Sequence, residues 1–309
     1  MEYIVFLFSM AALIKGADYV IDESELIAHH FGISSFVIGA TIVALGTSLP
    51  EMAASIFASA EGKSDLAVSN VIGSTIFNIA LVLGVVFIMA GKMITQRDIF
   101  QKDSAWALFP ILIFFVVGFD GIISRYEGFI YLCVMGAYIL FLTNNADEIV
   151  EISEDVDDEK FDWTRTALWL LLGFVMVVVG ANFTVESASI IARNFGVSEW
   201  VIGLMLVALG TSLPEFVVSL QAAKKGNTDM ILGNIIGSNV ANFTVVLGAA
   251  AMVNPLKVDF TLNAFDIFSA LILTVMLVFV AANKLYNRST GIVFILMLAL
   301  VLGNTIKAI

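Results

Sequence analysis

The sequence predicts an all-α membrane protein of about ten transmembrane helices, arranged as two inverted repeats of five helices. Three observations predict this fold class: an apolar composition, apolar runs that recur along the chain, and a segment that occurs twice. Of the 309 residues, 60% are hydrophobic and only 14% are charged, and the mean hydropathy is +0.98. Soluble domains contain about 45–50% apolar residues, so this composition indicates a polytopic membrane protein.

The expected spans are apolar runs that approach or reach the roughly 17–25 residues needed to cross a bilayer as a helix. Ten such runs follow one another along the chain. They cover residues 3–21, 35–57, 66–90, 104–119, 126–142, 165–185, 199–221, 229–252, 265–282 and 291–307.

The two copies of the repeated segment align without gaps. Residues 31–84 align with residues 195–248, an offset of 164 (195 − 31), and 27 of the 54 aligned positions are identical. The nonapeptide VALGTSLPE occurs in both copies, ending at Glu51 and at Glu215. The sequence therefore predicts two five-helix halves, residues 1–150 and 163–309. Because five is odd, the second half enters the membrane from the opposite side, an arrangement typical of secondary transporters.

An acidic linker at residues 144–162 joins the halves, and it explains most of the net charge of −12. No basic face is present, so nucleic acid is not an expected partner, whereas the lipid bilayer is. The loops on the linker side hold nine Lys and Arg residues, against five on the other side. Since the richer side is normally cytoplasmic, we expect a multi-pass cell-membrane protein with the linker inside and both termini outside. Nothing in the sequence requires an oligomer.

A carboxylate and a proline interrupt an apolar run in both copies of the repeated motif. Pro50 and Pro214 cannot donate a backbone hydrogen bond, and each would displace the carbonyl four residues earlier in a continuous helix. The carbonyls near Ala44, Gly46 and Thr47 are therefore predicted to be free, and so are their counterparts in the second copy. At membrane depth such carbonyls need another partner.

The motif would place several oxygen-bearing residues on one face of a helix. Residues spaced i, i+3, i+4 and i+7 share one face of a helix, and four residues of each copy have this spacing: Ala44, Thr47, Ser48 and Glu51, and then Ala208, Thr211, Ser212 and Glu215. The following helix in each half adds polar residues spaced i, i+4 and i+8: Asn70, Ser74 and Asn78, and then Asn234, Ser238 and Asn242.

All of these donors are hard oxygen atoms. Calcium binds about six to eight oxygens, usually with carboxylates among them. The chain places no histidine or cysteine beside the motif, which disfavours zinc and copper. Two glutamates match the charge of one calcium ion, which offsets the cost of keeping them ionised within a membrane. No cofactor is expected beyond the transported ions.

The two GTSLPE motifs, each followed on the next helix by GS-x-x-x-N, resemble those of sodium/calcium exchangers in the cation/calcium antiporter superfamily, most closely its compact prokaryotic members. The resemblance covers essentially the whole chain. It implies exchange of calcium for several sodium ions by alternating access, and no enzymatic activity.

Carried over by position, the resemblance also implies roles for individual residues. Glu51 and Glu215 would be the central calcium ligands, helped by the carbonyls of Thr47 and Thr211. The sodium positions would fall on Ala44, Ser48, Ala208, Ser212, Ser74 and Ser238, and Asn78 and Asn242 would border the middle of the site. Some relatives have an aspartate where Asn242 stands, and the asparagine argues against potassium dependence.

Three other functions are compatible with parts of this pattern. Proton/calcium exchange could use a protonated glutamate, but the proton-coupled relatives resemble a G-N-x-x-E pattern and lack the Thr-Ser-x-Pro stretch. An intramembrane hydrolase would need two acids in different roles, whereas the two copies here are nearly identical. A channel is disfavoured because inverted repeats favour rocking over conduction.

Overall fold

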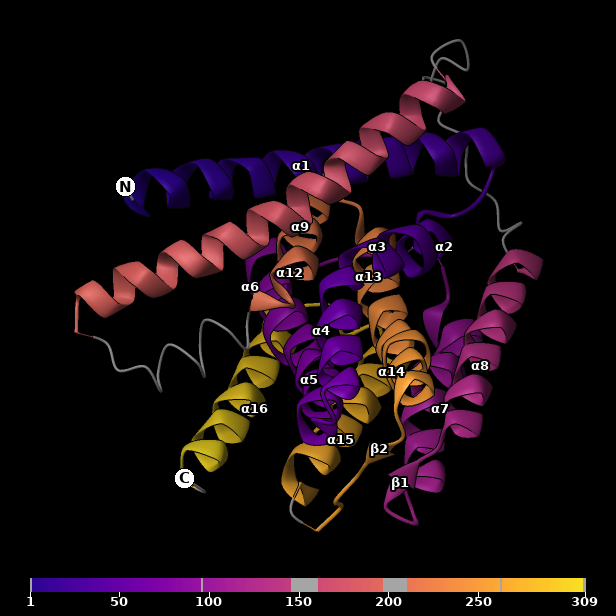
Figure 1. Cartoon of the computed structure of the whole chain (residues 1–309). Helices are drawn as coiled ribbons and strands as arrows, with labels where there is room; N and C mark the ends of the chain where they lie inside the picture. Colours follow the sequence, from indigo (N-terminus) through magenta and orange to yellow (C-terminus); the bar gives the residue numbers. More distant parts are fainter. Residues whose placement is uncertain (1, 96, 146–160, 197–209, 262, 308–309) are drawn as a thin grey trace. The chain divides into compact units, whose positions relative to one another are not determined.

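The structure, a computed structural model, describes residues 2–95, 97–145, 161–196, 210–261 and 263–307 (Figure 1). Within these residues the chain is almost entirely helical, with one pair of two-residue strands. The chain divides into two compact units. Unit 1 contains Met1–Pro50 and Leu142–Asn234, and unit 2 contains Glu51–Phe141 and Ile235–Ile309. Each unit contains segments of both predicted halves, so the division of the chain into halves remains a prediction.

Unit 1 is built on two long helices and a set of shorter ones. Its elements are α1 (Glu2–Phe31), α2 (Ser35–Ile38), the π-helix η1 (Gly39–Val43), α3 (Ala44–Thr47), α9 (Trp163–Asn194), α12 (Leu213–Lys224) and the first half of α13 (Thr228–Ala241). Both long helices are followed by a glycine with positive φ, Gly32 at 63° and Gly196 at 78°. A glycine just after the last turn adopts this conformation without a steric cost and ends the helix there.

The sequence-based boundaries of these two long helices are wrong. The expected runs were 3–21 and 165–185, but α1 has 30 residues and α9 has 32. Polar residues follow the apolar run in each case, and hydropathy alone therefore ended the prediction early. Neither helix contains a proline, and the internal glycines Gly16, Gly173 and Gly180 stay helical, so the backbone continues as a helix to Phe31 and Asn194.

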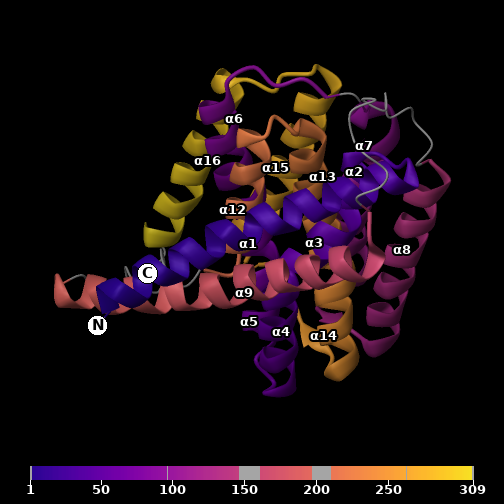
Figure 2. The same cartoon turned by 90° about the horizontal axis from the view of Figure 1, so that it is seen from above.

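The helices α1 and α9 occupy matching places in the two repeats and pack against each other in opposite directions (Figures 1 and 2). Near the start of α1, the Thr184 hydroxyl donates to the Ser9 hydroxyl at 2.9 Å. At the middle, a Cβ added to Gly16 would lie 2.8 Å from the Gly173 carbonyl oxygen. Residue numbers therefore increase along α1 in the direction in which they decrease along α9, so the two helices are antiparallel. Glycines on both helices allow their backbones to approach closely. Inverted repeats require their first helices to run antiparallel, as these do.

Unit 2 contains most of the remaining helices. Its elements are α4 (Leu49–Ala60, entering from unit 1), α5 (Ser64–Ile76), η2 (Phe77–Leu83), α6 (Gly84–Ala90), α7 (Ile99–Val117), β1 (Ile122–Ile123), α8 (Arg125–Asn144), the end of α13, η5 (Asn242–Val246), α14 (Leu247–Val253), β2 (Leu256–Lys257), α15 (Ala264–Ala282) and α16 (Arg288–Lys307).

Glycine contacts in unit 2 come in reciprocal pairs that join one half of the sequence to the other. A Cβ added to Gly291 on α16 would lie 2.6 Å from the Gly84 carbonyl oxygen on α6. The repeat counterpart of Gly84 is Gly248 on α14, where an added Cβ would lie 2.9 Å from the Gly128 carbonyl oxygen on α8. Two-fold symmetry between the halves would produce this exchange of partners.

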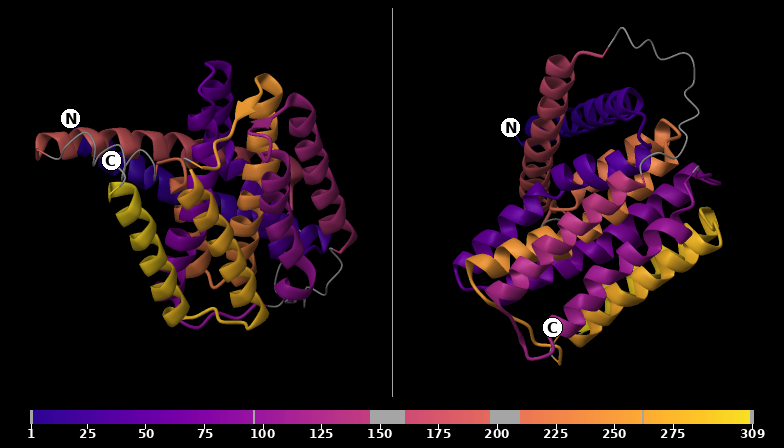
Figure 3. Two further views of the ribbon diagram at one scale, coloured as in Figure 1. Left: turned by 90° about the horizontal axis from the view of Figure 1, so that it is seen from below. Right: turned by 90° about the vertical axis from the view of Figure 1, so that its right-hand side faces the viewer.

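The connecting segments of unit 2 repeat the same reciprocity. The strands β1 and β2 pair antiparallel, with Ile122 opposite Lys257. At the positions 164 residues away in each direction, the Met93 amide donates to the Tyr286 carbonyl oxygen at 3.0 Å. The loop after α6 therefore lies beside the α15–α16 connection (Figure 3, left). These matched contacts support the inverted-repeat prediction.

The structure confirms the all-α membrane class. Seven described helices are long and apolar enough to span a bilayer, or eight if the broken pair Ser35–Thr47 and Leu49–Ala60 is one span. On α16, the apolar stretch that qualifies by composition, Arg288–Asn304, is shorter than these. The seventh expected run, 199–221, lies partly outside the described residues. The count of ten spans therefore stays a prediction.

Candidate functional site

In both copies of the repeated motif a new helix begins directly after the serine. In the first copy, α3 ends at Thr47 and α4 begins at Leu49, with Ser48 between them at φ −82° and ψ 7°. In the second copy, Ser212 precedes α12 at φ −87° and ψ 5°. The nearly equal dihedral angles show that identical residues fold in the same way in both halves.

This break corrects two expectations. Pro50 and Pro214 lie in the first turn of a new helix, where a missing N–H costs nothing, rather than inside one kinked helix. The carbonyl of Ala44 is not free, because it accepts the Ser48 amide at 3.0 Å and the Thr47 hydroxyl at 3.2 Å. A new helix start satisfies the backbone in a way that the proline rule alone does not predict.

The break also places the two glutamates. Glu51 lies in the first turn of α4, and Glu215 lies in the first turn of α12. The N-terminal end of a helix carries partial positive charge, which favours a negative side chain at that position. Both glutamates are completely buried, with 0% of each residue exposed. Among the described residues the third fully buried carboxylate, that of Asp103, has Arg97 as its counter-ion at 2.7 Å.

In unit 1, Glu215 accepts a hydroxyl from the other copy of the motif; we call Thr47, Ser48, Ser212, Glu215 and Asn234 the Glu215 cluster. The Ser48 hydroxyl donates to Oε1 of Glu215 at 3.1 Å. The Thr47 hydroxyl lies 3.1 Å from the Val43 carbonyl oxygen and 3.4 Å from Oδ1 of Asn234. Ser212 is buried beside the break. The cluster offers carboxylate, hydroxyl and amide oxygens.

In unit 2, Glu51 has a similar environment; we call Glu51, Ser55, Asn70 and Ser74 the Glu51 cluster. The Ser74 hydroxyl donates to Oε1 of Glu51 at 3.4 Å. The Asn70 amide donates to the backbone carbonyl of Glu51 at 3.1 Å and to the Ser55 hydroxyl at 2.9 Å. The glutamate is therefore held from its backbone and from its side chain.

Three buried asparagines of unit 2 lie at or near π-helical turns. The Asn78 amide donates to Oδ1 of Asn239 at 3.1 Å, and both residues are buried. Oδ1 of Asn78 and both polar atoms of Asn242 are buried without a hydrogen-bond partner among the described residues. Asn78 lies in η2, and Asn242 begins η5. Buried amides without partners are costly, and π-helical turns are frequent at functional sites, so these amides are candidate ligands.

Sequence reasoning missed one pair of contacts that supports the site. The Asn234 amide donates to the Ser219 hydroxyl at 3.2 Å, which repeats the Asn70–Ser55 contact of the first half. The sequence did indicate this contact: Ser55 and Ser219 occupy the same position in the two repeats, one helical turn after Glu51 and Glu215. Asn239 had no such signal, because its repeat counterpart is Thr75.

The structure brings together only some of the predicted ligands. Within unit 1, Ser48 meets Glu215, and within unit 2, Ser74 meets Glu51. Ser238 and Ala44 are buried, and their proposed roles as ion ligands stay predictions. Ala208 lies outside the described residues. The remaining roles, including those of Ser212, Thr211 and Asn242, stay predictions.

Thr211 lines a hollow of about 340 Å³ in unit 1. Its other described lining residues are Asn182, Val185, Glu186, Ser189 and Arg193 of α9, together with Gly210. The hollow reaches a residue that the resemblance assigns to calcium.

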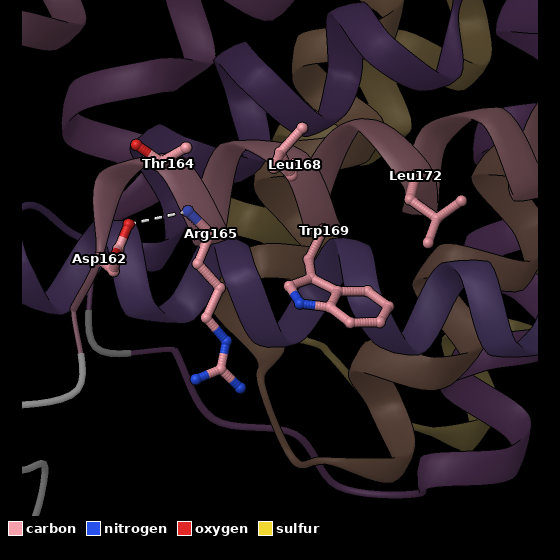
Figure 4. Close-up of a pocket in the computed structure, with 6 residues that line it drawn as sticks. All are labelled: Asp162, Thr164, Arg165, Leu168, Trp169 and Leu172. Atoms are coloured by element: carbon pink, nitrogen blue, oxygen red, sulfur yellow. Dashed lines mark hydrogen bonds between the residues drawn. The ribbon is translucent and has the colours of Figure 1, made fainter.

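A second hollow, of about 610 Å³, lies along the first turns of α9 and contains none of the predicted ligands. Figure 4 shows Arg165 and Trp169 pointing to the same side of the helix, while Asp162 accepts the Arg165 backbone amide. A cation and an indole near the end of an apolar helix are typical of a membrane–water boundary. This hollow therefore carries no argument about ion transport.

The chemistry of the two clusters selects a class of ligand. Within the described residues, no group of three or more histidine, cysteine or acidic side chains gathers, so a site rich in soft or multiply charged ligands is not supported there. Each cluster instead combines one carboxylate with neutral oxygens. Hard cations such as Na⁺ and Ca²⁺ prefer such ligands.

Comparison with known proteins decides the family. The family model described as sodium/calcium exchanger protein matches residues 1–144 and 165–307. The chain belongs to the sodium/calcium exchanger family. The matched ranges leave out most of the acidic linker, whose composition sets it apart from both halves.

Relatives match this exchanger over nearly its whole length. It is 30% identical to the sodium/calcium exchanger MaX1 of Methanosarcina acetivorans, over 96% of this chain and 95% of the relative. It is 37% identical to an uncharacterised membrane protein of Methanocaldococcus jannaschii, over 94% of this chain and 93% of the relative. A solved structure of the sodium-calcium exchanger NCX_Mj, soaked with Na⁺ and no Ca²⁺, is 33% identical with a TM-score of 0.85, covering 98% of both chains.

Proposed function

We propose that this protein is a secondary antiporter that exchanges Ca²⁺ for several Na⁺ ions by alternating access. The observation that carries the proposal is the pair of completely buried glutamates, Glu51 and Glu215, each with a serine hydroxyl on Oε1. Ionisable residues within membrane helices are expensive and mark ion pathways. The family match over both halves supports the same function.

Both glutamates are proposed as calcium ligands, helped by the carbonyls of Thr47 and Thr211. The sodium ligands are proposed to include Ser48, Ser212, Ser74 and Ser238, together with Ala44 and Ala208, while Asn78 and Asn242 border the middle of the site. The hydroxyl contacts to both carboxylates support this assignment, because a hydroxyl can turn its lone pairs to a bound cation. No cofactor is required for this exchange.

Sodium is favoured over protons as the counter-ion. Sodium must exchange its water for protein oxygens, and the buried serines and threonines of the motif supply them. A proton needs only one acceptor and gives no reason for a hydroxyl beside each carboxylate.

Calcium flux into proteoliposomes tests the proposed function directly. Purified protein in sodium-loaded vesicles should take up radioactive calcium when diluted into sodium-free buffer. Vesicles with equal sodium on both sides should take up little, and a pH gradient alone should not replace the sodium gradient. Uptake without any counter-ion gradient, as through a channel, would contradict antiport.

The proposed orientation places the acidic linker in the cytoplasm and both termini outside, since the linker side is richer in Lys and Arg. Cysteines introduced at Asp157 and at Ile309, in a Cys133→Ala background, should then react from opposite sides of intact cells. Cys133 must be removed because its thiol is exposed on α8. Labelling of both positions from the same side would contradict an odd number of spans in the second half.

A further inference from the structure

A buried pair of amides in unit 2 joins the two repeats. Nδ2 of Asn78 on η2 donates to Oδ1 of Asn239 on α13 at 3.1 Å, and both side chains are buried. The resemblance assigns no ion to Asn239. Its contact nevertheless determines which end of the Asn78 amide is engaged with the protein, and that end is the nitrogen.

The oxygen of Asn78 is the end left for a ligand. Asn78 is completely buried, and its Oδ1 has no hydrogen-bond partner among the described residues of unit 2. One turn earlier on the same polar face lies Ser74, whose hydroxyl donates to Oε1 of Glu51 at 3.4 Å. Asn78 therefore continues the helix face that contacts Glu51, and its oxygen is available there to a cation.

The two ends of an asparagine amide have nearly the same shape and opposite electrical character. The oxygen accepts hydrogen bonds and binds hard cations, whereas the NH₂ group only donates and repels a cation. Rotation about the last side-chain bond exchanges the two ends, because that torsion has broad, roughly two-fold minima. An asparagine is therefore a cation ligand in only one of its two orientations.

An empty ion site favours the wrong orientation of such an amide. The Glu51 carboxylate is completely buried, and it is negative when the site is ready to bind a cation. A negative charge attracts an NH₂ group and repels an amide oxygen, and charge-assisted hydrogen bonds are roughly twice as strong as neutral ones. The Asn239 oxygen opposes this rotation, because it already holds the NH₂ group of Asn78.

The repeat counterparts indicate that this arrangement depends on the residue at position 239. Asn78 corresponds to Asn242, and Asn239 corresponds to Thr75. The Thr75 hydroxyl donates to the Val71 carbonyl oxygen of its own helix at 2.9 Å. Within the described residues of unit 2, neither polar atom of Asn242 has a hydrogen-bond partner. A threonine at this position is thus bonded to its own backbone and does not hold the amide opposite.

We propose that Asn239 is a positioning residue of the antiporter, which holds the Asn78 amide with its oxygen towards the transported cation. The proposal rests on the proposed function, since it concerns how one ligand of that site is oriented. Asn239 itself does not bind the ion. Its hydrogen bond keeps Asn78 in the binding-competent orientation before an ion arrives, so no free energy of binding is lost in turning the amide.

The expected size of the effect follows from the populations of the two orientations. The apparent affinity of a ligand falls in proportion to the fraction of protein that is in the competent orientation. Loss of the Asn239 contact reverses a preference of ordinary hydrogen-bond strength, so the competent fraction falls from a majority to a minority. Ion affinity is then expected to fall about threefold to tenfold.

Asn239→Thr tests the proposal with a side chain that the fold already accepts at the repeat-related position. Equilibrium binding of radioactive calcium to the purified full-length protein gives the calcium affinity in sodium-free buffer, and displacement by sodium gives the sodium affinity. Asn239→Thr should weaken the binding of at least one of the two ions threefold or more. Asn239→Ser carries the same test if the threonine variant is unstable.

Thr75→Val is the matched control. Thr75 is as buried as Asn239 and occupies the repeat-related position, but its hydroxyl donates to its own helix. This variant should leave both ion affinities within about twofold of the original values.

A second comparison separates orientation from packing. A carboxylate presents an oxygen in either orientation, so an aspartate at position 78 needs no partner to orient it. In an Asn78→Asp background, Asn239→Thr should therefore change ion affinity by less than about twofold, whatever the affinity of that background.

A merely structural role gives a different result. Asn239→Thr would then lower thermal stability and leave both affinities unchanged, or weaken them by the same factor in both backgrounds. Either result, in a protein that binds both ions, would overturn only the role of Asn239. Failure of the unchanged protein to bind calcium or sodium would overturn the proposed function, and this proposal with it.

Discussion

Glu51→Gln and Glu215→Gln should each reduce calcium exchange by at least about a hundredfold while leaving a folded protein. Glutamine keeps the size of the side chain and can still accept the serine hydroxyl, but it removes one of the two charges that balance calcium. Removing one partner from a buried charge pair costs about 3–5 kcal/mol, and about 1.4 kcal/mol corresponds to a tenfold change in binding. Sodium-driven calcium uptake into proteoliposomes measures the loss.

The control for these variants is Glu61→Gln. Glu61 follows the end of α4, the helix that begins beside Glu51, but its side chain is 63% exposed and pairs with Lys63. This variant should exchange calcium at close to the original rate. Full activity in Glu51→Gln, with the protein monodisperse and thermally stable, would remove Glu51 from the calcium site.

The sequence predicted the repeat, the buried carboxylates and the class of ion because each follows from residue identity. A glutamate that occurs in an apolar run of both repeats indicates an ion site, whether or not the helix continues through the motif. The structure then shows both Glu51 and Glu215 completely buried with hydroxyl contacts. The family expected from the GTSLPE motifs is confirmed by the match over both halves.

The break at Ser48 and Ser212 could not be predicted from periodicity. A helical face was expected to continue from Ala44 to Glu51, and the same spacing fits a continuous helix and a broken one equally well. Whether the helix is continuous or broken depends on whether nearby N–H groups can pair with the carbonyl groups at the end of the first helix. Here the Ser48 amide completes the end of α3 through Ala44, and Pro50 then starts a new helix.

The asymmetry between the halves was also hidden, for the opposite reason. Comparison of repeats draws attention to identical positions, whereas the contact of Lys225 with Asp22 falls on positions whose counterparts, Glu61 and Glu186, are both acidic. The partner of Lys225 on α1 comes from a distant part of the sequence, so only the folded chain shows which charges meet.

The double variant Ser48→Ala with Ser212→Ala should weaken sodium binding about tenfold or more and calcium binding by a smaller factor. The Ser48 hydroxyl contacts Oε1 of Glu215, and Ser212 is buried at the matching break. Hydrogen bonds to charged groups contribute about 1.5–3 kcal/mol, so removing two hydroxyls is expected to have a large effect. Calcium draws mainly on the carboxylates, which remain.

Sodium competition against bound calcium separates these effects. In the unchanged protein, sodium should displace calcium with a steeper than first-order dependence, since several sodium ions replace one calcium ion. The serine variant should need a higher sodium concentration for half-displacement, while its calcium affinity in sodium-free buffer changes less. Ser55→Ala with Ser219→Ala is the matched control, because these equally buried serines hold Asn70 and Asn234 rather than a carboxylate.

The control pair should alter sodium and calcium binding in the same proportion. A proton-coupled exchanger predicts another outcome: a pH gradient would drive calcium exchange at the full rate without sodium, and the serine variant would respond like the control. That result would make the proton, not sodium, the coupling ion, because proton transfer needs one carboxylate and no hydroxyl ligands. Selective loss of sodium competition would instead tie the repeated Thr-Ser-x-Pro stretch to the coupling ion, since only sodium depends on replacing its water with those oxygens.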